Sequence, residues 1–177
     1  MSALDVLKQI DDFHLMIDRG KSNAEVIALY KRFVISEMKE LQDAMKVPEI
    51  VKEACDVIVV CRPIIRLDRG NQGLVHVAIN DSMIAIVKAL TGSWIEALYR
   101  VNQSNLSKFI LCHEIADARG HFESMGINVR IEPINETYFG AYAVEDQNVN
   151  GKVYEHDKLL KGPKYCAIDE SIEWWKV

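Results

Sequence analysis

Apolar residues recur at intervals of three and four along most of the first 120 positions, which is the pattern of helices that turn one face to a core. Gly20, Pro48 and the stretch 91–93 interrupt this pattern and separate one helix from the next. Pro63 is expected to end or kink the helix in which it falls. Helices are therefore predicted over about 3–18, 24–45, 48–63, 74–90 and 94–102, with the last able to continue to residue 119.

The apolar period changes from three or four to two in the C-terminal third of the chain. Ile127, Val129 and Ile131 alternate with polar residues, which is the pattern of a strand with one buried face. The segment 133–136 contains turn-forming residues and can reverse the chain into a second strand that ends near Val144. A β-hairpin is therefore predicted here.

The chain beyond the hairpin is polar. Residues 145–151 indicate a loop, and residues 152–164 are basic. The expected fold class is mostly α, with an antiparallel helical bundle as its core. The helical core is assigned to residues 1–125, and the hairpin with its basic tail, residues 126–177, is expected to belong to the same domain.

Two pairs of acidic residues have the spacing of neighbours on a helix. Glu37 and Glu40 fall in the second predicted helix, and Glu53 and Asp56 fall in the third. Both pairs follow the rhythm of the apolar stripe, so they are expected to be partly buried. Clustered carboxylates repel one another unless a cation neutralises them, and ligation by oxygen alone favours Mg²⁺, with Mn²⁺ as a second possibility.

The acidic residues also fit a simpler explanation. Lys39 and Lys52 lie close to the two pairs in sequence, so the four acids could belong to a solvated helix face stabilised by ordinary charge pairs. From these residues alone, both interpretations stay open.

Composition narrows the function classes. The net charge of −5 argues against a non-specific nucleic-acid-binding protein. The four cysteines lack zinc-site spacing, which favours reduced thiols and a cytoplasmic location. The chain has no stretch of eighteen uninterrupted apolar residues and its first residues do not have the pattern of a signal peptide, so neither a membrane span nor secretion is expected.

The acid pairs resemble the ExxE…ExxD signature of the all-α nucleoside triphosphate pyrophosphohydrolases, a superfamily that includes MazG-like proteins and phosphoribosyl-ATP pyrophosphohydrolases. Three further stretches resemble motifs of the same superfamily in the same order. These are Phe13-His14 near the start, 104–108 (Ser-Asn-Leu-Ser-Lys) at the end of the helical core, and the Gly-Lys and Lys-x-Pro tail at 151–152 and 161–163.

The resemblance implies hydrolysis of a nucleoside triphosphate to the monophosphate and pyrophosphate, with Mg²⁺ as the cofactor. It implies that Glu40, Glu53 and Asp56 are metal ligands, whereas Glu37 is a ligand or orients the attacking water. Glu37 and Glu40 are thus the candidate catalytic residues. The candidate substrate-binding residues are Asn105, Lys108, Lys152, Lys161 and His14, with a core position as the alternative for His14.

The resemblance also implies self-association, as a homodimer or a homotetramer. The substrate specificity of the superfamily cannot be carried over to this chain, because two features lie outside the minimal core. Glu53 and Ser93 are forty residues apart, which leaves room for an additional helix, and the predicted hairpin is the second feature. Pool sanitising and hydrolysis of dUTP or dCTP are the leading possibilities. Phosphoribosyl-ATP hydrolysis is the nearest alternative, and a non-catalytic helical interaction module is the alternative from another class.

Overall fold

The computed structural model describes residues 1–68 and 70–168, and these form two compact units. The first unit consists of Met1–Asn102 together with Ile168, and the second consists of Gln103–Ala167. The boundary expected at residue 125 therefore falls inside the second unit. The end of the expected tail, residues 169–177, lies outside the described residues.

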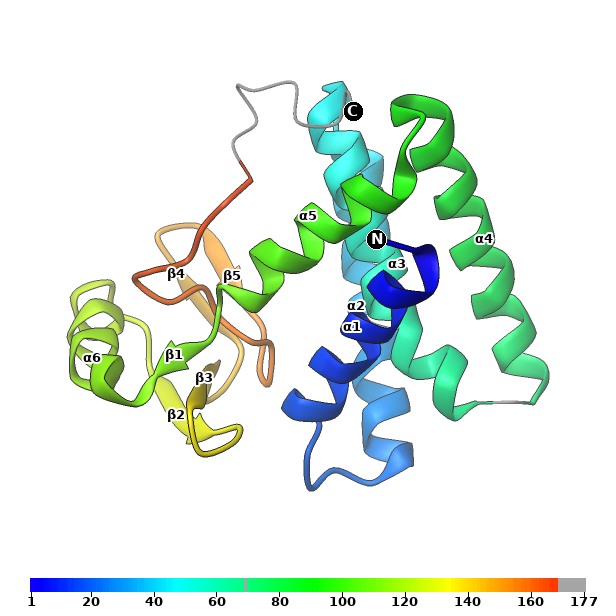
Figure 1. Cartoon of the computed structure of the whole chain (residues 1–177). Helices are drawn as coiled ribbons and strands as arrows, with labels where there is room; N and C mark the ends of the chain where they lie inside the picture. The colour runs from blue at the N-terminus through cyan, green and yellow to red at the C-terminus, as the bar shows by residue number, and fades with distance from the viewer. Residues whose placement is uncertain (69, 169–177) are drawn as a thin grey trace. The chain divides into compact units, whose positions relative to one another are not determined.

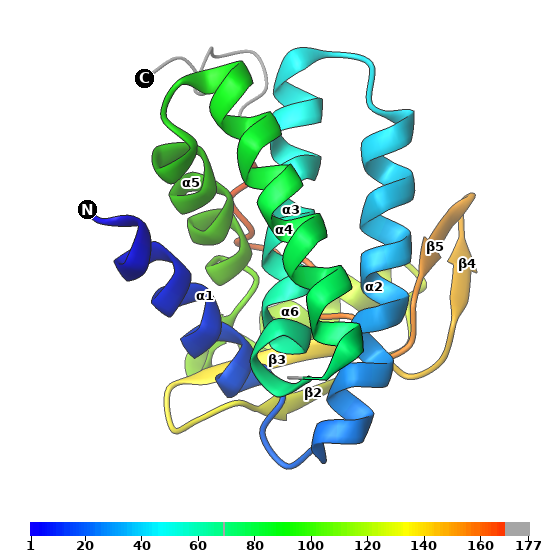
Figure 2. The same cartoon turned by 90° about the vertical axis from the view of Figure 1, so that its right-hand side faces the viewer.

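The first unit is helical. It contains α1 (Ala3–Ile17), α2 (Asn23–Asp43), α3 (Val47–Leu67), α4 (Asn71–Thr91) and the part of α5 (Trp94–Leu106) that ends at Asn102. The helix α3 packs against α2 and α4, and also against α1 (Figures 1 and 2). Its fully buried side chains lie in the middle of one hydrophobic core. The expected mostly helical fold class is confirmed.

The helix α3 continues through Pro63 to Leu67, so it does not end at Pro63, which was one of the two outcomes expected there. A proline inside a helix lacks the N–H that would bond the carbonyl four residues earlier, which here is Val59. The ring of His14 on α1 lies with its Nε2 atom 2.9 Å from that carbonyl oxygen. The imidazole N–H of His14 thus replaces the missing backbone donor, and the helix extends one further turn.

The helix α4 packs one side against α3 and exposes the other. Asn80, Met83 and Val87 form its buried side, with exposed fractions of 6%, 7% and 0%. The helical spacing of the sequence predicts a buried stripe of Val75, Ile79, Met83, Ile86 and Leu90, but Val75, Ile86 and Leu90 are exposed. Residues 73–91 are long and apolar enough, by length and composition alone, to cross a membrane, although no span was expected.

The second unit contains a small antiparallel sheet. Its strands are β1 (Ile110–Leu111), β2 (Val129–Pro133) and β3 (Tyr138–Ala143), arranged in the order β1-β3-β2. The pairing of β2 with β3 confirms the predicted hairpin. The helix α6 (Ile115–Ser124) supplies Ala118 and Phe122 to the same core as the sheet. This packing explains why the compact unit begins well before residue 126.

The helix that begins at Trp94 ends at Leu106, close to the expected end near residue 102 and without the continuation to residue 119 that was left open. A short strand and a 3₁₀ turn, η1 (Cys112–Glu114), follow it. One expectation for the second unit is wrong. The expected loop at 145–151 contains the strand β4 (Gln147–Val149), which pairs with β5 (Lys152–Tyr154). The turn between them is Asn150-Gly151, whose φ angles of 54° and 81° suit a two-residue hairpin turn.

Candidate functional site

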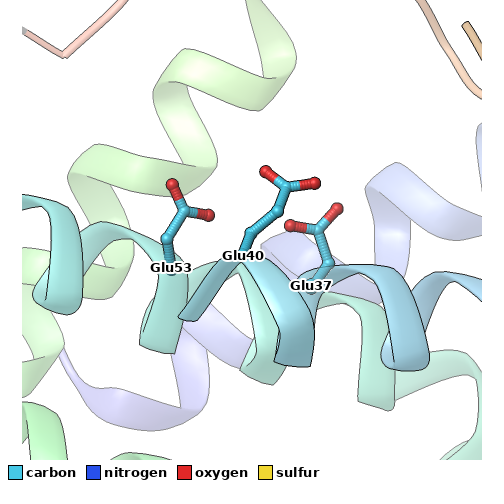
Figure 3. A group of neighbouring side chains, drawn as sticks. All are labelled: Glu37, Glu40 and Glu53. Carbon is cyan, nitrogen blue, oxygen red and sulfur yellow. The ribbon is translucent and has the colours of Figure 1, made fainter. Parts of the chain in front are cut away.

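Three of the four predicted acids lie together in the first unit. Glu37 and Glu40 extend from α2 and Glu53 extends from α3, and one carboxylate oxygen from each lies within 4.8 Å of the others. Their carboxylates point to the same side of the helix pair, with Glu40 between the other two (Figure 3). The arrangement arises because α2 and α3 pack side by side and the i, i+3 spacing places Glu37 and Glu40 on one face of α2.

The three glutamates differ in burial. Glu37 is buried, with 8% of its surface exposed, Glu53 is half-buried, and Glu40 is exposed. The Oε2 atom of Glu53 is buried without a hydrogen-bond partner in the described part of the chain. Burial raises the pKa of Glu53, and the charges of Asp56 and Glu40 raise it further, while Lys52 acts against them. The site therefore disfavours the ionised form of Glu53 unless a further cation approaches it.

The fourth predicted acid, Asp56, does not belong to the group of three. Its Oδ2 atom lies 3.1 Å from Nζ of Lys52, and the same ammonium group lies 2.6 Å from Oε1 of Glu53. Burial lowers the pKa of Lys52, but the carboxylates of Asp56 and Glu53 raise it by more, so the lysine stays charged. The charge pairs considered in the simpler explanation are thus present at Glu53 and Asp56.

The donor set of Glu37, Glu40 and Glu53 fits a hard divalent cation. It consists of oxygens only, as Mg²⁺ and Mn²⁺ prefer. Two ligands of one Mg²⁺ lie at most about 4 Å apart, given bond lengths of about 2.1 Å. Oxygens that already lie within 4.8 Å of one another could reach such positions by small side-chain rotations. The buried Oε2 of Glu53, which has no protein donor among the described residues, is the atom that a cation would satisfy best.

His14 lies in the core of the first unit, with 2% of its surface exposed. Its Nε2 contacts the carbonyl of Val59, and its Nδ1 lies 2.7 Å from the hydroxyl of Tyr30. A carbonyl oxygen only accepts, so the Nε2 atom donates to Val59, and the Nδ1 atom is hydrogen-bonded to the Tyr30 hydroxyl. Both ring nitrogens therefore hold the fold together, which favours a structural role for His14.

The remaining candidate substrate-binding residues belong to the second unit. The Nζ atom of Lys108 donates to the side-chain oxygen of Asn105 at the end of α5. Lys152 lies over the ring of Tyr154, and Lys161 lies over the ring of Tyr165. Both of these lysines are exposed. Lys152 and Lys161 are thus accessible to an anion such as phosphate, although their contacts with the tyrosine rings form without any bound anion.

The serines of the 104–108 stretch attach the C-terminal segment to the end of α5. The hydroxyl of Ser104 lies 2.9 Å from the carbonyl oxygen of Cys166, and the backbone N–H of Cys166 donates to Oγ of Ser107. The motif at 104–108 and the segment that follows Pro163 therefore come together in the second unit. The hydrogen bonds of these two serines to the Cys166 backbone explain their presence without a bound ligand.

Asn102 is a candidate that the sequence analysis missed. It is completely buried, and neither its side-chain oxygen nor its nitrogen has a hydrogen-bond partner among residues 1–68 and 70–168. A buried amide without partners destabilises the folded state, so such groups are uncommon away from functional sites. The available signal was a polar residue beside Val101 and Leu98 on the apolar stripe of α5.

Comparison of the chain with protein-family models, with curated proteins and with solved structures finds no match.

Proposed function

We propose that this protein is a metal-dependent nucleotide pyrophosphohydrolase, which converts a nucleoside or deoxynucleoside triphosphate and water into the monophosphate and pyrophosphate. The observation that carries the proposal is that Glu37, Glu40 and Glu53 lie together on two packed helices, and that one buried carboxylate oxygen of Glu53 has no hydrogen-bond donor among the described residues. The resemblance of the acid pairs and of the later motifs to the all-α nucleoside triphosphate pyrophosphohydrolases supplies the reaction type and the corresponding fold.

In this proposal the three glutamates hold the metal, and Asp56 joins them if Lys52 releases it. Mg²⁺ or Mn²⁺, when bound, would neutralise charge on the phosphates and lower the pKa of a water molecule. Glu37 is the most buried of the acids, so its carboxylate is fixed in position and suited to orient the attacking water or accept its proton. Lys108, Lys152 and Lys161 are candidates for contacts with phosphate, and Asn105 for a contact with sugar or phosphate.

The test is a panel of nucleoside and deoxynucleoside triphosphates assayed with Mg²⁺, with pyrophosphate and orthophosphate measured separately. The expected products are monophosphate and pyrophosphate in equal amounts, without a diphosphate intermediate. Activity should disappear with EDTA and return when Mg²⁺ or Mn²⁺ is added in excess. Orthophosphate as the first product would refute the proposed bond cleavage, and no turnover of any nucleotide would refute the proposal as a whole.

Phosphoribosyl-ATP hydrolysis is the alternative that uses the same acids. It requires the same α–β bond cleavage, so the acids do not distinguish the two reactions. Including phosphoribosyl-ATP in the panel separates them. Turnover of phosphoribosyl-ATP far above that of every simple triphosphate would favour the alternative.

A non-catalytic helical module is the alternative from another class, and one observation favours it. Lys52 already pairs with both Glu53 and Asp56, as in an ordinary charged helix face. Such a module would show no stabilisation by Mg²⁺. The proposed enzyme should gain about 2.7 kcal/mol of unfolding free energy at a Mg²⁺ concentration about one hundred times its Kd. A cytoplasmic location and the lack of nucleic-acid partners stay predictions.

A further inference from the structure

The helix α4 exposes large apolar side chains toward both of its ends. Leu74 and Val75 near the start of the helix are 71% and 59% exposed, and Val77, Ile86 and Leu90 are each between 37% and 38% exposed. These residues, with the small and charged residues between them, are called here the outer face of α4. In Figure 2 this helix lies in front of α3, on the side nearest the viewer. Several large apolar side chains exposed along one helix are typical of an interaction site.

The middle of the outer face consists of small residues. Ala78, Ser82, Ala85 and Ala89 are all exposed and are separated by four, three and four positions. This spacing places them along one line of the helix. Small side chains on such a line allow a second helix to approach closely, since the distance between helix axes depends on the side chains at the contact.

Two opposite charges interrupt the outer face. Asp81 and Lys88 are the only Asp, Glu, Lys or Arg residues between Gly73 and Thr91, and both are exposed. They are seven positions apart, so they lie on the same side of the helix, too far apart to pair with each other. Among the residues that the structure describes, neither forms an ion pair.

We propose that the outer face of α4 binds the outer face of a second copy of this chain, with the two helices antiparallel about a two-fold axis. In a two-fold interface every contact occurs twice. If one residue contacts a second residue of the partner subunit, the same two residues also meet with the subunits exchanged. An axis between Ile84 and Ala85 lies midway between Asp81 and Lys88. Asp81 then faces the partner subunit's Lys88, and Lys88 faces the partner subunit's Asp81. The face is thus complementary to itself in charge, and its small residues lie at the crossing point.

The charge pattern and the packing of α4 favour a second copy over a lipid bilayer. Each charged side chain at the centre of a membrane span costs about 2.5–3.5 kcal/mol. In addition, α4 packs along α3, which carries Lys52, Glu53 and Arg62, so inserting α4 would draw these charges toward the membrane. A two-fold pair neutralises Asp81 and Lys88 instead, and it covers the apolar side chains around them.

Charge reversal tests the interface directly. The molar mass of the full chain is measured by analytical ultracentrifugation across a dilution series, without nucleotide or metal, so the result does not depend on the proposed enzymatic activity. The wild type should form dimers, or larger assemblies built from them. Asp81→Lys and Lys88→Asp should each weaken association at least tenfold, because like charges then meet twice across the axis.

Two combinations of the same substitutions should restore association. The double variant Asp81→Lys/Lys88→Asp regains complementary charges within its own dimer. An equal mixture of the two single variants should form heterodimers, since one contributes only lysines and the other only aspartates. Restoration also rules out a folding defect as the cause of the loss, because the double variant carries both substitutions. Asp12→Lys and Lys8→Asp, at exposed positions on α1, are matched controls that should associate like the wild type.

The proposal is overturned if the wild type remains monomeric at about 100 μM, well above the Kd of specific protein pairs. It is also overturned if the single variants associate as tightly as the wild type, or if neither combination restores association. Co-sedimentation with vesicles of neutral and anionic phospholipids provides the remaining outcome. A monomer that binds these vesicles through α4 would identify the outer face as a membrane contact and exclude this proposal.

Discussion

The neighbours of Glu53 have opposite effects on the pKa of its carboxylate. Lys52 donates to one of its oxygens, whereas the other oxygen is buried without a hydrogen-bond partner in the described structure. The net effect is a raised pKa, with burial as the main cause. At neutral pH, ionised Glu53 therefore makes the metal-free protein less stable than it would be with an uncharged side chain of the same shape.

Glu53→Gln should separate a metal ligand from a surface charge. The substitution keeps the shape and removes the charge, so metal-free unfolding free energy should hold or rise, while hydrolytic activity should fall by about a hundredfold or more. The increase in melting temperature on adding Mg²⁺ should be much smaller in the variant than in the wild type. Melting curves and initial rates, each with and without Mg²⁺, provide these measurements.

The matched control is Glu96→Gln on α5. Glu96 pairs with Arg100 on the surface, so its loss should change stability by only about 0.3–0.5 kcal/mol and leave the Mg²⁺ response unchanged. Full activity and an unchanged Mg²⁺ response in Glu53→Gln would show that Glu53 belongs to a charged helix face and not to a metal site.

Asp18 should make stability depend on pH. Its side chain is buried at the end of α1, where one oxygen has no hydrogen-bond partner among the described residues, and burial raises its pKa from 3.8 to about 6. The charge of Lys21, the hydrogen bond from the Tyr30 hydroxyl and the charge of Arg66 oppose this shift only in part. The folded state thus holds the Asp18 proton more tightly than the unfolded state. Stability from this group is fully present below about pH 3.8 and is lost as the pH rises through about 6.

Asp18→Asn should remove that dependence. The shift in the Asp18 pKa corresponds to a decrease in the wild-type unfolding free energy on the order of 3 kcal/mol between pH 4 and pH 7. The measurement is urea unfolding of both proteins at intervals across this range. The difference between the two unfolding free energies isolates Asp18 from other titrating groups. Parallel curves, with a constant difference, would contradict the assigned protonation.

The helix α2, which carries Glu37 and Glu40, begins with a capping box. The hydroxyl of Ser22 accepts from the backbone N–H of Glu25, and the carboxylate of Glu25 accepts from the backbone N–H of Ser22. These bonds satisfy donors that the first helical turn leaves without partners. The cap lies more than three turns before Glu37, so it contributes to the stability of the helix and not to the chemistry of the acids.

Ser22→Ala should lower the unfolding free energy by about 1 kcal/mol. The turnover rate and the response to Mg²⁺, measured well below the melting temperature, should be unchanged, because α2 remains folded there. Ser22→Asp retains a capping acceptor and should recover most of the lost stability. A loss of activity without a loss of stability would mean that the start of α2 takes part in the site.

The two units of the chain have separate hydrophobic cores. The core of the first unit is built from α1 to α5, and the core of the second unit is built from α6 and the three-stranded sheet. Phe122 is 1% exposed and is one of the buried side chains of the second core. Destabilising one core should therefore affect mainly its own unit.

Phe122→Ala should destabilise the second unit by about 3–5 kcal/mol, because it leaves a cavity. Hydrogen exchange should become faster in β2 and β3, while the amides of α2 and α3 keep their protection and respond to Mg²⁺ as in the wild type. Equal loss of protection in both units would show that they unfold as one cooperative body.

Local pattern was sufficient to predict the helices, the main hairpin and the placement of Glu37 and Glu40 on one face of their helix. These features depend on periodicity and on side chains three residues apart, which are properties of short segments. The second hairpin was missed because β4 and β5 are short and polar, although Asn150-Gly151 is a turn signal. The end of α5 at Leu106 was not apparent either, since the residues beyond it also suit a helix.

The three-dimensional arrangement was needed wherever two distant segments meet. Only the packing of α1 on α3 places His14 at the carbonyl that Pro63 leaves without a backbone donor, so a histidine considered for the substrate pocket has a structural role. Only packing reveals that Lys52 pairs with Glu53 and Asp56, and that Asp56 does not join the other acids. Likewise, the side of α4 that faces solvent depends on its contact with α3. A sequence pattern specifies the faces of a helix, but neighbouring elements determine which of those faces is covered.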